Sequence, residues 1–264
     1  MNAKAKLIGM VGTGFMNPHG LDAVGHVTTA RDILMMGIHA VSFNNIVSVW
    51  NKKVHRFNIR GSNAREMTVG TSVAGSALTN YYYIFGGKTG TVPNVMNVLL
   101  IVNAPNGDMF VGVVLKALGD RFADAKEVFD VATLYLNPDY IPPEGGNIVN
   151  ADKVAVCLLP KHNPAFFMQY DVPLLFGKNE TVAEAPASIT KIMTAMVLLE
   201  NVYDINEMIE IIASDITIGS GGTFYAGDKI SFKDALYCLL LPSSNTMAVA
   251  VSRVVGGKIL RSKQ

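Results

Sequence analysis

The sequence predicts an α/β fold in which strands and helices alternate, and three observations support this prediction. Half of the 264 residues are hydrophobic and 16% are charged, so the chain can bury a large core, which excludes intrinsic disorder. Two apolar runs, Val95 to Val102 and Met109 to Leu115, flank Asn106-Gly107, which is a strong signal for a β-hairpin. The segment from about Phe122 to Leu136 then carries apolar residues at helical spacing.

The elements before this hairpin follow from local signals. A short helical stub opens the chain, and several glycines and a proline make Gly12 to Val27 a loop. Thr28 and Thr29 offer N-cap oxygens to a helix from about Ala30 to Ala40, whose apolar residues form a stripe. From Val54 to Tyr83, β-branched residues are frequent and their alternation is patchy, so we expect short strands and turns.

The second half of the chain begins with a linker. Asn137 to Val149 contains three prolines and two glycines, so it can be neither a helix nor a central strand. The hydrophobic pattern then predicts strands at Lys153 to Leu159 and roughly Phe166 to Leu175, helices at Ser188 to Glu200 and about Ile205 to Ala213, a glycine-rich loop at Gly219 to Gly227, a helical region at Phe232 to Val255 interrupted at Pro242, and a polar, basic end at Gly256 to Gln264.

Composition excludes several classes of function. A formal net charge of +1 gives no field that would gather phosphate groups, so nucleic acid is not expected as a partner. The apolar runs are shorter than the roughly 18 to 20 residues of a spanning helix, so no transmembrane segment is expected. Cys157 and Cys238 lie in apolar contexts, which predicts buried free thiols. The spacing of His19, Asp22 and His26 fits no zinc motif, and no metal site is expected.

A serine and a lysine within one helical turn are the first candidate catalytic groups. Ser188-Ile-Thr-Lys191 opens a predicted helix, and the i to i+3 spacing places the hydroxyl and the amine on one face. A lysine held away from water or near other cations can be neutral enough to take the serine proton. The alternative is an N-cap serine beside a solvated lysine, because a Ser-x-x-Lys match is expected roughly once by chance in such a chain.

Lys88-Thr89-Gly90, which follows two glycines, is a more specific signal. Chance would produce such a tripeptide on the order of 0.05 to 0.1 times in a chain of this length. A phosphate-binding loop is discarded, because Tyr82 stands where the first glycine of a Walker A motif is needed. A lysine and a threonine framed by glycines at an apolar strand instead suit the binding of an extended substrate and its carboxylate along a strand edge.

A third polar pair lies at the predicted helix break. Pro242 interrupts the helical region, and the kink can aim Ser243 and Asn245 into a cleft. Ser42-Phe-Asn44 has the same Ser-x-Asn pattern, and local capping is the alternative interpretation of both. Only Ser243 lies between a buried-looking helix and a kink, which favours that triplet as a site.

The Ser-x-x-Lys, Ser-x-Asn and Lys-Thr-Gly motifs together are the signature set of the penicillin-recognising serine enzymes. The sequence resembles in particular the D-alanyl-D-alanine carboxypeptidases among the low-molecular-mass penicillin-binding proteins. Further segments that look like the family cover most of the chain: Pro186 to Ala195, Gly227 to Ser231, Leu239 to Asn245, Asn17 to Asp22 and Thr28 to Asp32. The resemblance implies a β-lactamase/transpeptidase-like α/β (α+β) fold, with an antiparallel sheet flanked by helices plus an all-helical lobe.

The order of the motifs differs from that of the family, which runs from the nucleophile through Ser-x-Asn to Lys-Thr-Gly. Here Lys88 precedes Ser188, so residues 1–264 resemble a single, circularly permuted domain. Joining Gln264 to Met1 restores the family order, and residues 138–149 then form a linker between the family's usual C- and N-terminal ends. Such a linker reaches at most about 40 Å, and permutation succeeds where the original termini are close.

The resemblance also implies a role for each motif residue. Ser188 would be the acylated nucleophile and Lys191 its general base. Ser243 would relay a proton to the departing amine, Asn245 would hold the substrate amide, and Lys88 would assist proton transfer.

The substrate-binding groups implied by the resemblance lie around Lys-Thr-Gly. Lys88 and Thr89 would help to grip the terminal carboxylate, Gly90 would also bind substrate, and the backbone N–H groups of Ser188 and Thr91 would form an oxyanion hole. Arg121 resembles a family arginine near that carboxylate, the alternative being a solvated arginine in the first turn of a helix.

The implied reaction removes the terminal D-alanine of peptidoglycan stem peptides ending in D-Ala-D-Ala, through an acyl-enzyme on Ser188 and without a metal or cofactor. β-Lactam antibiotics such as penicillins would acylate the same serine. Two alternatives stay open: a penicillin- or peptidoglycan-binding module without turnover, and a serine β-lactamase. Between Asn245 and Lys88 in restored order the only glutamate is Glu66, which lacks the Glu-x-x-Leu-Asn form that would activate a deacylating water, so slow penicillin release is expected.

The resemblance also gives a location, because the family works outside the cytoplasmic membrane, in the cell envelope or periplasm. Met1 leads directly into Asn-Ala-Lys-Ala-Lys and not into a signal peptide, so we expect a mature fragment or a recombinant piece. The segment from Pro160 to Lys178 is a weaker match to the opening hairpin of the family.

Overall fold

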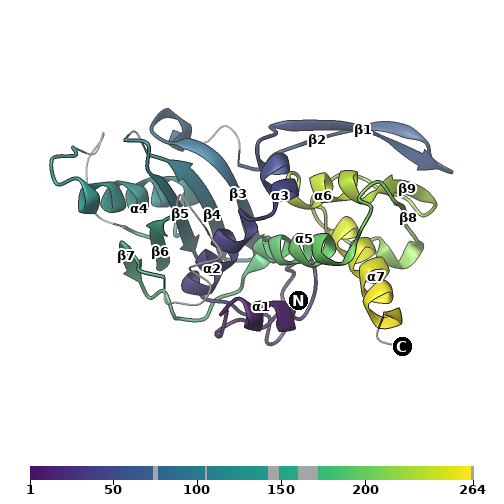
Figure 1. Ribbon diagram of the computed structural model, residues 1–264, viewed down its shortest axis with the longest axis horizontal. Helices are drawn as coiled ribbons and strands as arrows, with labels where there is room; N and C mark the ends of the chain where they lie inside the picture. The colour runs from purple at the N-terminus through teal and green to yellow at the C-terminus, as the bar shows by residue number, and fades with distance from the viewer. Residues whose placement is uncertain (74–76, 105, 142–148, 160–171, 263–264) are drawn as a thin grey trace.

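The computed structural model describes residues 1–73, 77–104, 106–141, 149–159 and 172–262 (Figure 1). Its helices are α1 (Asn2–Leu7), α2 (Ala30–Ala40), α3 (Asn44–Trp50), α4 (Arg121–Leu136), α5 (Thr190–Asn201), α6 (Phe232–Leu240) and α7 (Asn245–Arg261). Its strands are β1 (Val54–Gly61), β2 (Arg65–Gly70), β3 (Tyr83–Val92), β4 (Val95–Asn103), β5 (Met109–Leu115), β6 (Lys153–Leu158), β7 (Phe176–Lys178), β8 (Met208–Glu210) and β9 (Asp228–Ser231).

Five antiparallel strands form the larger sheet, in the order β3-β4-β5-β6-β7. Helix α4 covers one face of this sheet, and α2 lies on the other (Figure 1). The side chains of β4 alternate accordingly: Leu99 and Ile101 join the core of α2 and α5, whereas Val98 and Leu100 join the core under α4. Strand β3 lies at the edge of the sheet and borders the turn that precedes α5.

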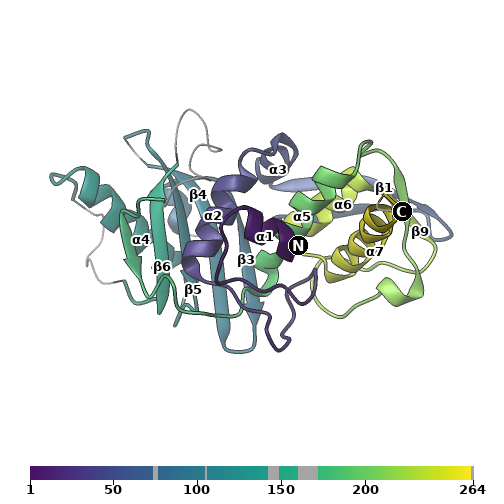
Figure 2. The same ribbon diagram turned by 60° about the horizontal axis from the view of Figure 1, so that its bottom comes forward.

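The second lobe consists of α5, α6 and α7 together with a small antiparallel sheet in the order β2-β1-β9-β8 (Figures 1 and 2). The resemblance implied an all-helical lobe, and the small sheet is the difference. The short strands that the sequence predicted between Val54 and Tyr83 are confirmed as β1 and β2, which belong to this sheet. The β1–β2 hairpin buries Phe57, Ile59 and Val69, whereas most positions between them are exposed. This alternation of buried and exposed residues matches a sheet with one buried face. Polar residues interrupt the hydrophobic alternation, so the strand pattern is weaker in the sequence.

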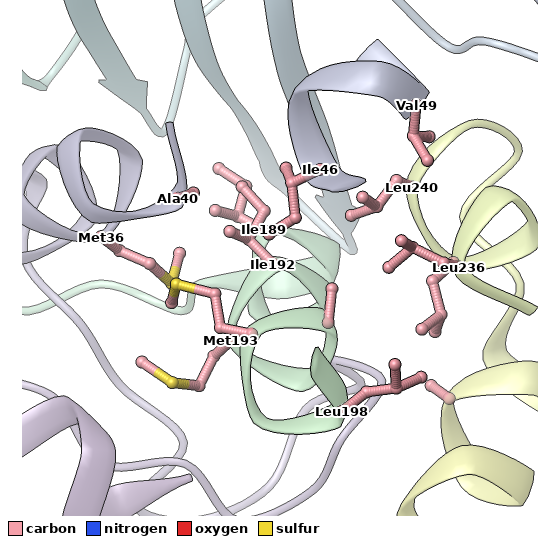
Figure 3. Close-up of a cluster of buried hydrophobic side chains, with 14 of the residues drawn as sticks. Met36, Ala40, Ile46, Val49, Ile189, Ile192, Met193, Leu198, Leu236 and Leu240 are labelled. Atoms are coloured by element: carbon pink, nitrogen blue, oxygen red, sulfur yellow. The ribbon is translucent and has the colours of Figure 1, made fainter. Parts of the chain in front are cut away.

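Helix α5 lies in the middle of the molecule, where it packs against α6 and α7 of its own lobe and against α2 of the other (Figure 1). Figure 3 shows its Ile192, Met193 and Leu198 among side chains of α2, α3 and α6. Burying each side chain of this size stabilises the fold by roughly 1.5–3 kcal/mol. The first turn of α5 is therefore fixed from several directions, which prepares it to hold a catalytic group.

Several predicted elements are confirmed. The side chain of Thr29 accepts a hydrogen bond from the Asp32 N–H, so it caps α2 as expected. Helix α6 ends at Leu240, just before Pro242, and α7 follows. Both cysteines are buried free thiols. In the described part of the chain, no single helix is long and apolar enough for a membrane span, whereas the α2–α3 pair, bent by 102°, reaches those values only when both helices are combined.

Other predictions are wrong or incomplete. The predicted helix from Ile205 to Ala213 is instead strand β8, because Ile209 and Ile211 are buried and alternate with partly exposed neighbours, a period of two. Helix α7 continues through Gly256 and Gly257 to Arg261, beyond the predicted end at Val255. Helix α3 was not predicted. Of the predicted strand at Phe166 to Leu175, residues 166–171 lie outside the described residues, and β7 begins only at Phe176.

Candidate active site

A 3₁₀ turn over Ala187–Ile189 presents Ser188 immediately before α5. Two glycines let other segments approach this turn closely. A Cβ on Gly20 would lie 2.0 Å from Ala187 O, and a Cβ on Gly90 would lie 3.0 Å from Ala187 Cβ. Ala187 itself has a left-handed φ of 50°, which costs free energy in a residue with a side chain. The packing around Ser188 therefore holds a strained backbone in place.

The amine of Lys191 contacts three oxygen atoms. Lys191 is fully buried, and its Nζ lies 2.8 Å from Ser188 Oγ, 2.7 Å from Asn245 Oδ1 and 2.6 Å from His19 O. A neutral amine has two N–H donors and one lone pair. It can donate to the Asn245 and His19 oxygens while its lone pair accepts the proton of Ser188, which is the geometry of an activated serine.

Two buried lysines set the electrostatics of the site. Burial, followed by the nearby charge of Lys88, lowers the pKa of Lys191 from 10.5 to about 6. Burial, followed by the charge of Arg121, lowers the pKa of Lys88 from 10.5 to about 7. Desolvation acts in this direction because it disfavours the ammonium form. Near pH 7, Lys191 is therefore mostly the free amine that a general base requires.

The Lys-Thr-Gly residues lie on the edge strand β3. Lys88 is fully buried, and its Nζ donates a hydrogen bond of 2.9 Å to Thr89 O. Thr89 Oγ1 lies 2.8 Å from Ser72 Oγ, while Thr91 is exposed. An edge strand offers backbone N–H and C=O groups to an extended ligand. This arrangement matches the strand-edge site that the sequence predicted.

Arg121 begins α4 and binds the β3–β4 hairpin. Its Nη1 donates to Gly90 O at 2.8 Å and to Asn97 O at 3.0 Å, and its Nη2 donates to Thr91 Oγ1 at 2.8 Å. Burial lowers the pKa of Arg121 from its ordinary value. The alternative of a solvated arginine is thus wrong, and a fixed cation lies beside β3.

The Ser-x-Asn residues lie at the junction of α6 and α7. Asn245 Nδ2 donates to Ile218 O at 2.8 Å while its Oδ1 contacts Lys191, so both ends of the amide are fixed. Ser243 is 6% exposed and has a left-handed φ of 70°. Its Oγ has no hydrogen-bond partner among the described residues. An unpaired buried hydroxyl costs free energy that a bound group would recover, which is typical of a functional position. In contrast, Ser42 Oγ donates to His39 O, which is local capping.

The loop from Gly12 to Val27, to which sequence analysis assigned no catalytic role, contributes a backbone carbonyl to the site. Asn17 Oδ1 accepts hydrogen bonds from the His19 and Gly20 N–H groups, and this turn directs His19 O toward Lys191. Burial, followed by Lys191 and His26, lowers the pKa of the His19 imidazole to about 4. The Asn-Pro-x-Gly turn was the signal available in the sequence. Because every residue has a backbone carbonyl, the residue type could not reveal the role of His19 O.

The structure brings three of the predicted residues into direct contact and joins Arg121 to Gly90 and Thr91 on the strand edge. Ser188, Lys191 and Asn245 form one hydrogen-bonded cluster, although Asn245 is separated from Lys191 by 54 residues in the chain. The charge of Lys88 acts on Lys191, and that of Arg121 acts on Lys88. Such a cluster can carry out nucleophilic catalysis by a serine next to a cationic strand edge.

Comparisons with known proteins agree with this chemistry. A model of the D-alanyl-D-alanine carboxypeptidase family matches residues 1–119 and 169–260. The chain is 34% identical over 126 residues to D-alanyl-D-alanine carboxypeptidase DacC of Escherichia coli (strain K12), an alignment of 46% of this chain and 28% of that protein. The match therefore spans under a third of the length of that relative. None of the solved structures matches the chain significantly. Because the family match covers most of its residues, the chain belongs to the D-alanyl-D-alanine carboxypeptidase family.

Proposed function

We propose that this protein is a serine D-alanyl-D-alanine carboxypeptidase that removes the terminal D-alanine of peptidoglycan stem peptides. The observation that carries the proposal is the placement of the Lys191 amine against both Ser188 Oγ and Asn245 Oδ1. Family membership gives the substrate class, and the buried amine with its lowered pKa gives the means to activate the serine.

In the proposed reaction, Ser188 Oγ attacks the carbonyl carbon of the penultimate D-alanine while Lys191 takes its proton. The N–H groups of Ser188 and Thr91 stabilise the developing oxyanion. The peptide C–N bond then breaks as the proton held by Lys191 passes through the Ser243 hydroxyl to the departing amine of D-alanine, so both Lys191 and Ser243 return to their neutral forms. Water hydrolyses the ester on Ser188, which releases the shortened peptide and restores the hydroxyl.

Thr89, Gly90 and Arg121 bind the terminal carboxylate of the substrate in this proposal. Thr89 carries a hydroxyl on the strand edge, and the guanidinium of Arg121 is held by three hydrogen bonds of 2.8 to 3.0 Å to Gly90, Thr91 and Asn97. Lys88 adds a buried amine nearby, whose pKa of about 7 leaves it partly protonated at neutral pH. A guanidinium and a hydroxyl are suitable hydrogen-bond partners for a carboxylate.

β-Lactam antibiotics are proposed as inhibitors that acylate Ser188, and their release is expected to be slow. Glu66 lies on the β1–β2 hairpin, where 58% of its side chain is exposed and Arg56 is 3.6 Å away. This position suits a surface ion pair and not a base that activates water beside Ser188. A cell-envelope or periplasmic location follows from the proposed peptidoglycan substrate.

We further propose that residues 1–264 form one circularly permuted domain with residues 138–149 as its linker. The charge of Lys88 on β3 lowers the pKa of Lys191 on α5, so the two motifs lie near each other despite their reversed order in the chain. Met1 and the α7 residues Gly256 and Ile259 line the same cavity, so the two ends that the family would join lie on one side of the molecule. A chain that joins Gln264 to Met1 with a short Gly-Ser linker and begins at Val149 should fold and be acylated at an unchanged rate. Loss of folding in that variant would contradict the single permuted domain.

The pH dependence of acylation is predicted from the two lysines. The neutral form of Lys191 is the base, so the second-order rate of penicillin acylation should rise with pH through about 6, the pKa of Lys191. In Lys88→Met, the repulsion from Lys88 is absent, so the pKa of Lys191 rises and the acidic limb moves to higher pH. Stopped-flow or quench-flow rates between pH 4.5 and 9 measure this limb. An acidic limb at the same pH in both proteins would contradict the proposed coupling.

Release of D-alanine from an acetylated tripeptide ending in D-Ala-D-Ala tests the proposed activity. The parent protein should release D-alanine with multiple turnovers, and Ser188→Ala should release none. Stable penicillin acylation without peptide turnover would favour a binding module, and rapid penicillin turnover would favour a β-lactamase.

A further inference from the structure

A hollow outside the hydrogen-bonded catalytic cluster lies at the N-terminal end of β3. Its volume is about 390 Å³, and its wall is formed by the end of α3 with the two lysines that follow, by the segment between β2 and β3, and by the start of β3. Volumes of roughly 300–1,000 Å³ are typical of small-molecule sites. The hollow therefore has the size of a ligand site.

Two contacts connect this hollow to the strand that forms the catalytic site. The indole of Trp50, which lines the hollow, packs on Gly86, two residues before Lys88. A Cβ on Gly86 would lie 2.6 Å from Trp50 Cε3, so the glycine is what allows this close approach. Both chain neighbours of Ser72 also belong to the lining, and the Ser72 hydroxyl lies 2.8 Å from Thr89 Oγ1. A ligand in the hollow is thus bound next to the catalytic site without occupying it.

The charge of the lining is positive. Lys52 and Lys53 are both exposed, and in the described part of the chain neither ammonium has an ion pair or a hydrogen bond. None of the described residues that line the hollow is acidic. Two adjacent cations without a neutralising partner attract an anion. The hollow therefore favours a negatively charged ligand.

Two aromatic side chains define the rest of the ligand. Tyr83 is 65% exposed, so part of its ring is open to a ligand. Trp50 is only 7% exposed, and its Nε1 has no hydrogen-bond partner among the described residues. An indole N–H can only donate, and a buried donor without a partner costs free energy that an acceptor on a ligand would recover. A sugar ring has apolar C–H groups for an aromatic face and oxygens for such a donor.

We propose that this hollow binds a saccharide unit that carries a carboxylate, with Tyr83 against the sugar ring and with Lys52 and Lys53 against the carboxylate. The N-acetylmuramic acid units of peptidoglycan glycan strands have this chemistry where their lactyl carboxylate is free of a stem peptide. The choice of this source rests on the proposed carboxypeptidase function, because its substrate belongs to the same polymer. The hollow then holds a glycan strand beside the site that shortens stem peptides.

The chain has a single tryptophan, Trp50, and its fluorescence reports on the hollow directly. The first probe is the disaccharide of N-acetylglucosamine and N-acetylmuramic acid, which has a free carboxylate. N,N′-diacetylchitobiose supplies two neutral rings, and the phosphate ester of N-acetylglucosamine supplies a different anion. The muramic acid disaccharide should change the fluorescence saturably, and the neutral disaccharide should bind about fivefold more weakly, the contribution of one exposed ion pair. Tighter binding of the phosphate ester would overturn the carboxylate assignment.

Substitutions in the lining locate the two parts of the ligand. Lys52→Gln combined with Lys53→Gln should remove the preference for the charged disaccharide over the neutral one. Tyr83→Ala should weaken the binding of both disaccharides by about fivefold, because the aromatic contact with the ring is lost.

The controls make the same changes away from the hollow. Lys6→Gln combined with Lys229→Gln removes two exposed lysines of α1 and β9, and Tyr203→Ala removes an exposed tyrosine. Both control proteins should bind like the parent protein. No saturable change in fluorescence with either disaccharide, or an unchanged preference after Lys52 and Lys53 are replaced, would overturn the saccharide site. These measurements require no peptide hydrolysis, so failure of this site and failure of the proposed carboxypeptidase activity are distinguished.

Discussion

Replacing Lys191 with methionine is expected to slow penicillin acylation of Ser188 by on the order of 10²- to 10⁴-fold, the range that a general base contributes. The Nζ of Lys191 lies 2.8 Å from Ser188 Oγ, and methionine fills a similar volume without a group that accepts a proton. The free energy of unfolding should change much less than the activation free energy of acylation. Removing a buried lysine whose pKa falls from 10.5 to about 6 relieves a cost, whereas Asn245 Oδ1 and His19 O lose a donor, which costs about 1–3 kcal/mol each.

The control for this substitution is Lys233→Met, which removes an exposed lysine of α6. It should acylate at the parent rate. The measurement is the pseudo-first-order rate of adduct formation by mass spectrometry, combined with urea unfolding of each variant. Acylation of a folded Lys191→Met protein at the parent rate would show that another group is the base.

Gly20→Ala is expected to have the largest effect on stability and also to damage the site. A Cβ there would lie 2.0 Å from Ala187 O and 2.8 Å from Ser188 N, and Gly20 has a φ of 92°. The left-handed backbone costs about 1–2 kcal/mol in alanine, and the overlap adds about 1–3 kcal/mol. Because the overlap falls on the turn that presents Ser188, acylation should slow by more than about tenfold in the protein that stays folded.

Gly107→Ala separates the two causes. Gly107 has a similar φ of 85°, but a Cβ there meets nothing within 4 Å. That variant should be destabilised only by the cost of the left-handed backbone conformation, and it should keep the parent acylation rate. Urea denaturation and adduct formation on both variants measure the difference, and equal losses in the two proteins would contradict the packing of Gly20 against Ala187.

The sequence predicted those elements whose signals are local. The threonine cap of α2, the Asn106-Gly107 hairpin and the break at Pro242 depend on a few neighbouring residues, and the structure has them where expected. Strand β8 was mistaken for a helix because it is only three residues long. Its extended conformation depends on pairing with β9, and no local pattern in the sequence indicates that pairing. The pairing that completes the small sheet of the second lobe also has no local signal, because β1 pairs with β9 across a separation of more than 160 residues.

The candidate site divides in the same way. Side-chain motifs identified Ser188, Lys191 and Asn245, which the structure places in one hydrogen-bonded cluster. The carbonyl of His19 and the close approach of Gly20 were missed, because their contribution comes from the backbone. Motif spacing alone also left two environments open for Arg121, a carboxylate-binding site or solvent. The structure shows that its guanidinium binds the β3–β4 hairpin.

Intact mass after incubation with a penicillin tests the central claim most directly, with Ser188→Ala as the control. The account predicts a stable adduct of one penicillin mass on the parent protein, located on the peptide that contains Ser188, and none on the control. This result would mean that a chain with reversed motif order assembles a working nucleophile. No adduct together with no consumption of penicillin, in a protein that is folded by circular dichroism, would contradict the proposed enzyme.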